Sequence, residues 1–188
     1  MSRKAEIIRR DTVYQGYFDL EEVAFKHTTV DGGMSPAINR LVLNVGEVAA
    51  GLLIDRHRRR VVLVEQFRLP ALDRDGGWLT EVVAGRVDPG ETPVDAFRRE
   101  TLEEAGYEIA DPVQIHRFYP ASGTLAEHMT LFCAELGQRV NEGGGTDADE
   151  DIRVLDWSYA EFFSALDNGR IIDAKTIIAG LWLRQTQG

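Results

Sequence analysis

Apolar and β-branched residues recur in short runs along much of the chain, and turn residues separate the runs, which is the pattern of β-strands. The runs at residues 48–54 and 61–67 flank a charged turn at 55–60 and predict a hairpin with mostly buried faces. Further strands are expected at residues 14–18, 22–29, 37–45, 78–83, 113–118, 128–136 and 153–157, with a loop at 70–77. The strands before about residue 46 predict a separate small sheet.

The apolar spacing changes to a helical period at residues 92–105. Thr92 is suited to cap this helix, and Asp95 completes a capping-box pattern. Pro93 fits the first turn, and Gly106 fits the left-handed residue after the helix end. Two more helices are expected at residues 159–166 and 173–183. Strands and helices in this order predict an α/β architecture, a mixed sheet flanked by helices.

The composition is that of an ordinary globular protein. The chain has 188 residues, of which 44% are hydrophobic and 28% charged, so it can bury a core and form one domain, or one domain with a short appendage. Lys and Arg number 21 against 31 Asp and Glu, which gives a net charge of −10. A chain this acidic repels phosphate backbones, so we expect no nucleic-acid partner.

The sequence also argues against a membrane partner. Residues 1–10 carry charges without an apolar signal-peptide core, and residues 48–54 are far too short to span a bilayer. The one cysteine, Cys133, lies in the apolar run 131–134 and predicts a small buried residue, with little weight for a catalytic thiol. We therefore expect a cytoplasmic protein.

Three acids share one face of the helix expected at residues 92–105. At about 100° per residue, Glu100, Glu103 and Glu104 lie opposite the apolar stripe that would face the core. Like charges one turn apart repel, so a solvated acidic face is the simplest interpretation. The alternative is a metal site, because clustered carboxylates hold hard divalent cations such as Mg²⁺.

The residues around these acids favour the metal site. Residues 85–107 read GRVDPGETPVDAFRRETLEEAGY, which matches every fixed letter of the pattern GX5EX7REUXEEXGU. This stretch resembles the Nudix box, with Thr101 and Tyr107 at the two aliphatic positions. The resemblance implies a Nudix α/β/α sandwich with a mixed sheet, and so many fixed residues at fixed spacing make it a specific signal.

Elementary chemistry agrees with this resemblance. Water that attacks a diphosphate approaches a centre surrounded by negative oxygens, and divalent cations neutralise that charge. Glu100 and Glu104, one turn apart, can bind the same metal cluster, and Glu103 can join at its edge as a further catalytic acid. The resemblance implies these roles and adds the backbone carbonyl of Ala84 as a ligand, with two or more Mg²⁺ or Mn²⁺ ions per site. Arg99 and Glu91 are interpreted as a structural pair.

Beyond the box, the chain resembles the ADP-ribose pyrophosphatases over nearly its full length. The stretches that carry this resemblance are residues 12–18, 64–68, 81–85, 149–154, 169–171 and 181–183. That family hydrolyses ADP-ribose to AMP and ribose 5-phosphate and forms homodimers in which the N-terminal sheet reaches the partner's site. The resemblance implies N-terminal strands at residues 1–45, which form a small antiparallel sheet for dimerisation, and a hydrolase domain at 46–188. The GDP-mannose hydrolases share most of these features, including a glycine-rich stretch like residues 143–145.

The same resemblance suggests substrate contacts. Tyr17 and Phe18 match an aromatic pair that sandwiches adenine, although both could equally be core strand residues. Arg68 matches an arginine that contacts the diphosphate or ribose, a task that suits its planar donors. Two further matches are weaker, namely Arg40 and Glu127.

Three departures from the family pattern concern the substrate and the base. Leu41 and Val45 replace an acid and a second arginine, so polar substrate contacts are missing. Ser122 stands where the family has a proline. An acid that is the proposed base in one relative is here Ala148, so proton abstraction falls to Glu150, Asp149 or Asp147, or to metal-bound hydroxide. We favour Glu150, which also aligns with a metal-contacting acid; a non-catalytic nucleotide-sensing module is the alternative class of function.

Overall fold

The structure is a computed structural model that describes residues 3–146 and 150–186, and the chain forms two compact units. The smaller unit comprises Met1–Gly46 and Tyr119–His128, and the larger comprises Glu47–Phe118 and Met129–Gly188. Each is described by itself below.

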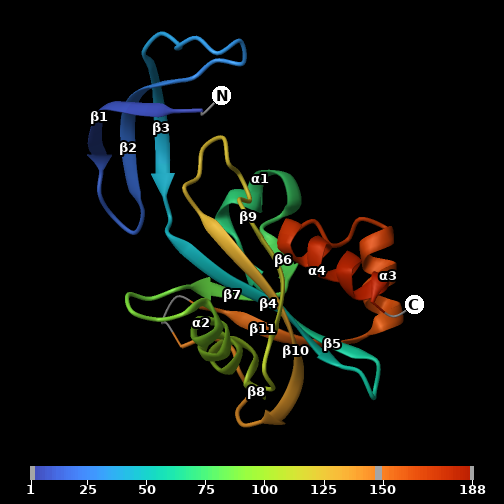
Figure 1. Cartoon of the computed structure of the whole chain (residues 1–188). Coiled ribbons are helices and arrows are strands. Elements are labelled where there is room, and N and C mark those ends of the chain that lie inside the picture. Colours follow the sequence, from blue (N-terminus) through green and yellow to red (C-terminus); the bar gives the residue numbers. More distant parts are fainter. Residues whose placement is uncertain (1–2, 147–149, 187–188) are drawn as a thin grey trace. The chain divides into compact units, whose positions relative to one another are not determined.

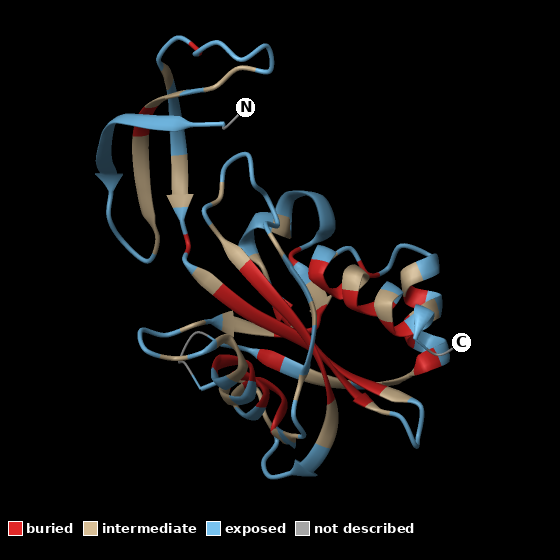
Figure 2. Ribbon diagram, viewed as in Figure 1, coloured by how far each residue is buried: buried red, intermediate tan, exposed pale blue. Residues whose placement is uncertain are grey.

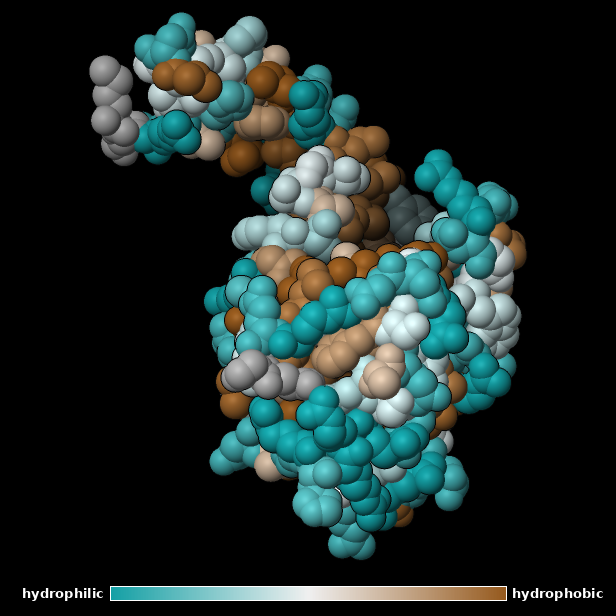
Figure 3. All heavy atoms as spheres, turned by 90° about the vertical axis from the view of Figure 1, so that its right-hand side faces the viewer, coloured by the Kyte–Doolittle hydropathy of each residue, from teal (hydrophilic) through white to brown (hydrophobic). Residues whose placement is uncertain are grey.

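The smaller unit is built on a three-stranded antiparallel sheet in the order β1-β2-β3 (Figure 1). Its strands are β1 (Ala5–Tyr14), β2 (Asp19–His27) and β3 (Ile38–Asn44). Residues 119–128 join it because the Leu43 amide donates to Thr124 O (3.0 Å) and the Ala126 amide donates to Leu43 O (2.9 Å). Hydrophobic surface is visible among the polar atoms of this unit (Figure 3).

The strand expected at residues 14–18 is wrong, since most of that stretch is the turn between β1 and β2. The sequence analysis missed β1 because every residue in it is exposed, so no apolar alternation marks it (Figure 2). Cross-strand ion pairs hold β1 instead: Arg9 lies 2.9 Å from Glu22, and Arg10 lies 2.8 Å from Glu21.

The larger unit is built on an eight-stranded sheet. Its main path is β11-β5-β4-β10-β8, with β6 paired to β5, β7 to β4 and β9 to β10. The strands are β4 (Glu47–Asp55), β5 (Arg60–Phe67), β6 (Trp78–Glu81), β7 (Val83–Arg86), β8 (Tyr107–Ile109), β9 (Val113–Phe118), β10 (His128–Arg139) and β11 (Ile152–Ser158). The described ladders beside β5 and β7 are antiparallel, whereas β4 and β10 run in the same direction (Figure 1). The sheet is therefore mixed, as expected.

Helices cover both faces of this sheet (Figure 1). One face carries α2 (Pro93–Glu100), which continues into the π-helical turn η2 (Thr101–Ala105), and the other carries α3 (Tyr159–Asp167) and α4 (Ala174–Gln185). The α/β/α sandwich is thus confirmed. Between β5 and β6, the expected loop instead contains two short helices, η1 (Leu69–Ala71) and α1 (Leu72–Asp75). In residues 3–146 and 150–186, no helix is long and apolar enough to cross a membrane.

The strand expected at residues 78–83 is divided into β6 and β7 at Val82. The Val82 amide donates to the Thr176 hydroxyl of α4 (2.8 Å) instead of to a neighbouring strand. This contact ties the start of α4 to the bend that leads into Ala84 and Gly85.

The change from α- to π-helix has a local cause. The Thr101 hydroxyl donates to the Phe97 carbonyl oxygen (2.7 Å), which a backbone amide would otherwise hold alone. Such back-bonding by threonine weakens the regular helical ladder. Thr101 is fully buried, so this hydroxyl replaces the aliphatic side chain that the box pattern has there.

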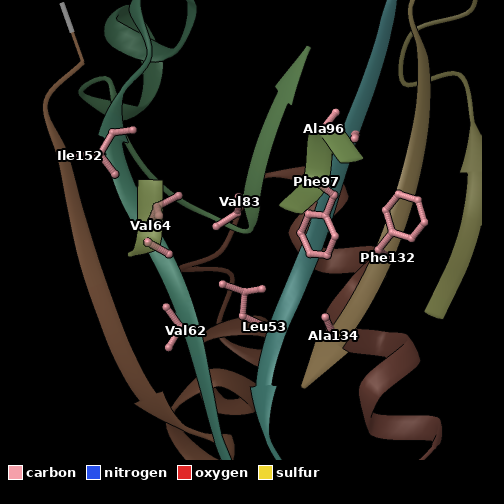
Figure 4. Close-up of a cluster of buried hydrophobic side chains, with 11 residues drawn as sticks. Leu53, Val62, Val64, Val83, Ala96, Phe97, Phe132, Ala134 and Ile152 are labelled. Carbon is pink, nitrogen blue, oxygen red and sulfur yellow. The ribbon is translucent and has the colours of Figure 1, made fainter. Parts of the chain in front are cut away.

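The core between α2 and the sheet is centred on Phe97 (Figure 4). Its ring stacks on Phe132 of β10 with ring centroids 5.4 Å apart. A Cβ on Gly51 of β4 would collide with the Phe97 ring, so the glycine makes room for it. Thr92 caps α2 as expected, since it accepts a hydrogen bond from the Asp95 amide (3.2 Å). The Asp95 carboxylate accepts from the Thr92 hydroxyl (2.6 Å) and not from the Thr92 amide, so the expected capping box is only half formed.

We expect Phe97→Ala to lower the free energy of unfolding by about 3–5 kcal/mol, because it removes a buried ring and leaves a cavity against the sheet. Urea denaturation followed by circular dichroism measures the change. Leu102→Ala, at an exposed position in η2, is the control and should cost less than about 1 kcal/mol. Equal losses in the two variants would contradict this description of the core.

Candidate active site

The acids of α2 and η2 are buried to different degrees. Glu100 and Glu104 are only 9% and 3% exposed, whereas Glu103 is half-buried. A solvated acidic face, the simplest interpretation of the sequence, is therefore wrong for Glu100 and Glu104. Buried carboxylates need hydrogen bonds and cations around them, so their partners show what the site is built to do.

The strand β7 lies directly against these two acids. Glu104 Oε2 accepts a hydrogen bond from the Ala84 amide (3.2 Å). A Cβ on Gly85 would overlap the Glu100 carboxylate, so only glycine allows the strand to pass this close. The first glycine of the box thus makes space for the acid rather than a tight turn.

Arg99 gathers the surrounding acids. Its guanidinium forms two hydrogen bonds to Glu91, both 3.1 Å long, and its Nη1 reaches Glu100 (2.7 Å) and Glu103 (3.1 Å). Its Nη2 also donates to the Arg86 carbonyl oxygen (3.0 Å), which fixes the loop before α2. Hydrogen bonds to Arg99 hold the pKa of Glu91 below its usual value. The structural pairing of Arg99 with Glu91 is as the sequence analysis predicts.

The electrostatics of the buried pair are unfavourable. Burial, and then the charge of Glu100, raise the pKa of Glu104 to about 8. Burial also raises the pKa of Glu100, although Arg99 opposes the shift. Two carboxylates that repel each other in a buried position gain stability from a proton or from a cation.

The glycine-rich stretch before Glu150 caps the end of η2. The amides of Gly144 and Gly145 donate to the Glu104 and Glu103 carbonyl oxygens, at 2.9 and 3.1 Å. Gly143, Gly144 and Gly145 all have positive φ angles, which other residues rarely adopt. The described part of this loop is therefore bonded to the acid-bearing helix.

This loop brings Glu150 to the carboxylate pair. Glu150 accepts a hydrogen bond from the Thr146 amide (2.8 Å), and its charge contributes to the raised pKa of both Glu100 and Glu104. The other candidates for the base, Asp147 and Asp149, and the neighbouring Ala148 lie outside the described residues.

Within residues 3–146 and 150–186, no three Asp, Glu, His or Cys side chains converge closely enough to form a metal site as they stand. Glu100 and Glu103 both turn to Arg99, and Glu104 turns to the Ala84 amide. The chemistry of the donors nevertheless fits a hard divalent cation, because all are carboxylate oxygens and two are buried beside each other.

The sequence analysis missed a second group of buried charges. Glu81, at the end of β6, is 2% exposed and contacts Arg68 twice (3.1 and 2.9 Å) and Lys175 once (2.7 Å). Lys175 also pairs with Asp173 (3.0 Å). The signal for Lys175 was available, because a lysine in the first turn of a helix opposes the helix dipole.

The other predicted substrate residues, Tyr17, Phe18, Arg40 and Glu127, belong to the smaller unit. Tyr17 is 76% exposed, so its interpretation as a core residue is wrong, and its ring meets Phe18 edge to face at 4.6 Å. Arg40 is exposed on β3 and donates to Asn39 O (2.9 Å), and Glu127 is half-buried.

Cys133 is buried, as expected. Burial raises the pKa of its thiol to about 12, so the thiolate needed of a nucleophile does not form near neutral pH.

A model of the NUDIX domain matches residues 46–178. The chain belongs to this family. It is 35% identical over 182 residues to an ADP-ribose pyrophosphatase of Escherichia coli, and this match covers 95% of this chain and 87% of that protein. A GDP-mannose pyrophosphatase of Cronobacter sakazakii is also 35% identical over 182 residues, covering 95% of this chain and 94% of that protein.

A solved structure has the same Nudix fold. The crystal structure of an ADP compounds hydrolase superposes with a TM-score of 0.73 and 20% sequence identity, covering 97% of this chain and 93% of that one. The family resemblance and the Nudix fold inferred from the box are therefore confirmed.

We expect the metal-free protein to become more stable as the pH falls from 8 to 6. The folded state binds a proton at Glu104 more tightly than the unfolded chain does, so stability is lost as the pH rises towards and through the folded pKa of about 8. Over this range the gain is about 2 kcal/mol from Glu104 alone. Urea denaturation in the presence of a chelator measures it.

The variant Glu104→Gln is the test of cause, because its amide keeps a hydrogen-bond acceptor for Ala84 but does not ionise. Between pH 8 and pH 6, the free energy of unfolding of this variant should rise by at least about 1 kcal/mol less than that of the unaltered chain. An identical pH dependence in both proteins would contradict the burial of an ionisable Glu104.

Proposed function

We propose that the chain is a hydrolase that cleaves the pyrophosphate linkage of a nucleoside diphosphate sugar, with ADP-ribose cleaved to AMP and ribose 5-phosphate. The observation that carries this proposal is the buried pair of Glu100 and Glu104, which repel each other beside a third acid, Glu150. The relatives named for ADP-ribose and GDP-mannose support the substrate class.

Ala84, through its carbonyl oxygen, and Glu100, Glu104 and Glu150 are the residues that would hold two or more Mg²⁺ or Mn²⁺ ions. Bound divalent ions neutralise the diphosphate and lower the pKa of water. Glu150 is our choice for the residue that accepts the proton of the attacking water, since it stands on a loop bonded to η2. Glu103, held by Arg99 at the edge of the pair, is the second acid assigned to catalysis.

In the larger unit, we assign substrate binding to Arg68. Arg68 keeps donors beyond the two that Glu81 accepts, and its side chain is 40% exposed, so it can bind a diphosphate oxygen. Tyr17 and Phe18 offer aromatic surface for a base, and Arg40 and Glu127 offer polar contacts.

A preference for GDP-mannose is the second candidate. A named relative and the glycine-rich cap at residues 143–145 support it. Of the two residues that replace polar substrate contacts of the ADP-ribose pattern, Val45 is buried, whereas Leu41 is 52% exposed. Leu41 is therefore the position at which a polar substrate contact would be lost. Because the complete set of box acids is present, a module that binds nucleotides without cleaving them is disfavoured.

We also propose a cytoplasmic homodimer in which the strands at residues 1–45 meet a second copy. Several large apolar side chains of this unit are about half exposed or more, among them Ile7, Ile8, Val13 and Tyr14. Apolar surface gathered on so small a sheet is typical of an interface.

The activity is tested with ADP-ribose and GDP-mannose in the presence of Mg²⁺ and alkaline phosphatase, which frees phosphate only after the pyrophosphate is cleaved. We expect faster release from ADP-ribose and a loss of more than about 100-fold in Glu104→Gln, because the metal cluster loses a ligand. The matched control Glu108→Gln changes an exposed acid of β8 and should retain activity. No release from either compound would refute the proposed function, and faster release from GDP-mannose would select the second candidate.

The dimer is tested by light scattering coupled to gel filtration. We expect twice the chain mass of 21.0 kDa, and the single-chain mass for Ile8→Glu, which puts a charge on the exposed β1. Val113→Glu, an exposed position in β9 of the larger unit, is the control. A single-chain mass for the unaltered protein at micromolar concentration would exclude the dimer.

A further inference from the structure

The buried charges around Glu81 join three elements of the larger unit. Arg68 directly follows β5, Glu81 ends β6, and Lys175 lies in the first turn of α4. Arg68 and Lys175 reach the same carboxylate oxygen, Glu81 Oε2, at 2.9 and 2.7 Å. Glu81 therefore lies between two cations, of which Arg68 precedes it in the sequence and Lys175 follows it.

Lys175 is held as rigidly as Glu81. It is 8% exposed, and its ammonium group lies between Glu81 and Asp173. Asp173 caps α4 by accepting from the Thr176 amide (2.9 Å), and the Thr176 hydroxyl accepts from the Val82 amide next to Glu81. Helix cap, lysine and strand end thus form one connected unit.

Stability alone does not explain these four charges. Burial opposes ionisation of Glu81, and Lys175 and Arg68 together hold its pKa below the usual value. Burial likewise opposes the charge of Lys175, and Glu81 and Asp173 raise its pKa in compensation. Well-packed apolar residues are often as stabilising as a buried ion pair, so stability does not require these charges.

The geometry of these charges fixes the orientation of Arg68. Glu81 accepts hydrogen bonds from Nε and Nη2 of Arg68, and these two bonds occupy one edge of the planar guanidinium. The opposite edge, with Nη1, therefore points away from Glu81. Arg68 is also close enough to Glu104 for each to shift the pKa of the other. Arg68 is thus part of the surroundings of the acid cluster.

We propose that Lys175 is a positioning residue, which locks Glu81 so that Glu81 orients Arg68 for the diphosphate of the substrate. This inference rests on the proposed function. Because Lys175 shares Oε2, it also takes part of the Glu81 charge, and Arg68 retains more positive charge for the substrate. Without Lys175, Arg68 would be the one cation left on Glu81, and the carboxylate would be held less firmly.

The experiment compares Lys175→Met, Arg68→Met and the double variant by kcat and KM for ADP-ribose. We expect Lys175→Met to lower kcat/KM about 10- to 100-fold, as for other residues that orient a ligating group, mainly through KM. In the Arg68→Met background the same substitution should change kcat/KM less than twofold, because its effect passes through Arg68. If Lys175 were only structural, Lys175→Met would instead lower kcat/KM by the same factor with and without Arg68.

A matched control comes from the other end of α4. Arg184→Met also removes a cation from this helix, one that pairs with Asp167 at 2.9 Å, and it should leave kcat/KM unchanged. Affinity for ADP-ribose in the presence of a chelator, measured by calorimetry, should fall with Lys175→Met and not with Arg184→Met.

The possible failures are distinct. If the unaltered chain cleaves no nucleoside diphosphate sugar, the proposed function and this inference fail together. If Arg68→Met lowers kcat/KM but Lys175→Met does not, only the positioning role fails. The same holds if Lys175→Met lowers kcat/KM by an equal factor with and without Arg68. If circular dichroism shows that Lys175→Met does not fold, Glu81→Gln takes its place, and the same dependence on Arg68 decides the outcome.

Discussion

The repulsion between two carboxylates buried one helical turn apart is the constraint around which the larger unit is arranged. Glu100 and Glu104 lie against β7, where only a glycine allows the strand to pass. Their raised pKa values show that this arrangement costs folding free energy at neutral pH. The fold meets that cost with Arg99 and the Ala84 amide, and a divalent cation would meet it more fully.

The elements on either side of the pair hold the neighbouring acids close together, although their charges repel one another. On one side, Arg99 joins Glu91, Glu100 and Glu103 to the loop that precedes α2. On the other, three glycines with positive φ angles bond to the end of η2 and bring in Glu150. The π-helical turn belongs to the same arrangement, because Thr101 loosens the helix between the two buried acids.

A second set of charges interacts with the first and is balanced, with two cations and two carboxylates. The acid cluster has several carboxylates around one arginine, whereas Glu81 lies between two cations. Arg68 belongs to both groups, since it binds Glu81 and interacts with Glu104. A site for a diphosphate needs such a neighbourhood, with acids to bind cations and a fixed arginine to bind the anion.

Much of the fold and part of the site could be predicted from the sequence. The spacing of hydrophobic residues located the hairpin of β4 and β5 and the helix α2, and the residues of the box indicated Glu100 and Glu104. These signals could be read because each depends on neighbours within one turn or one strand. The strand β1 gave no such signal, since ion pairs with β2 and not buried residues hold it.

The tertiary structure alone decided which acids are buried and what each one touches. The sequence gives no sign that Lys175 meets Glu81, because the two residues are 94 positions apart and only the docking of α4 on the sheet joins them. The same holds for the glycine cap on η2 and for the shift in the pKa of Glu104. Residue types and spacing determine which chemistry is available, whereas burial, which depends on the whole fold, determines how strongly each charge acts.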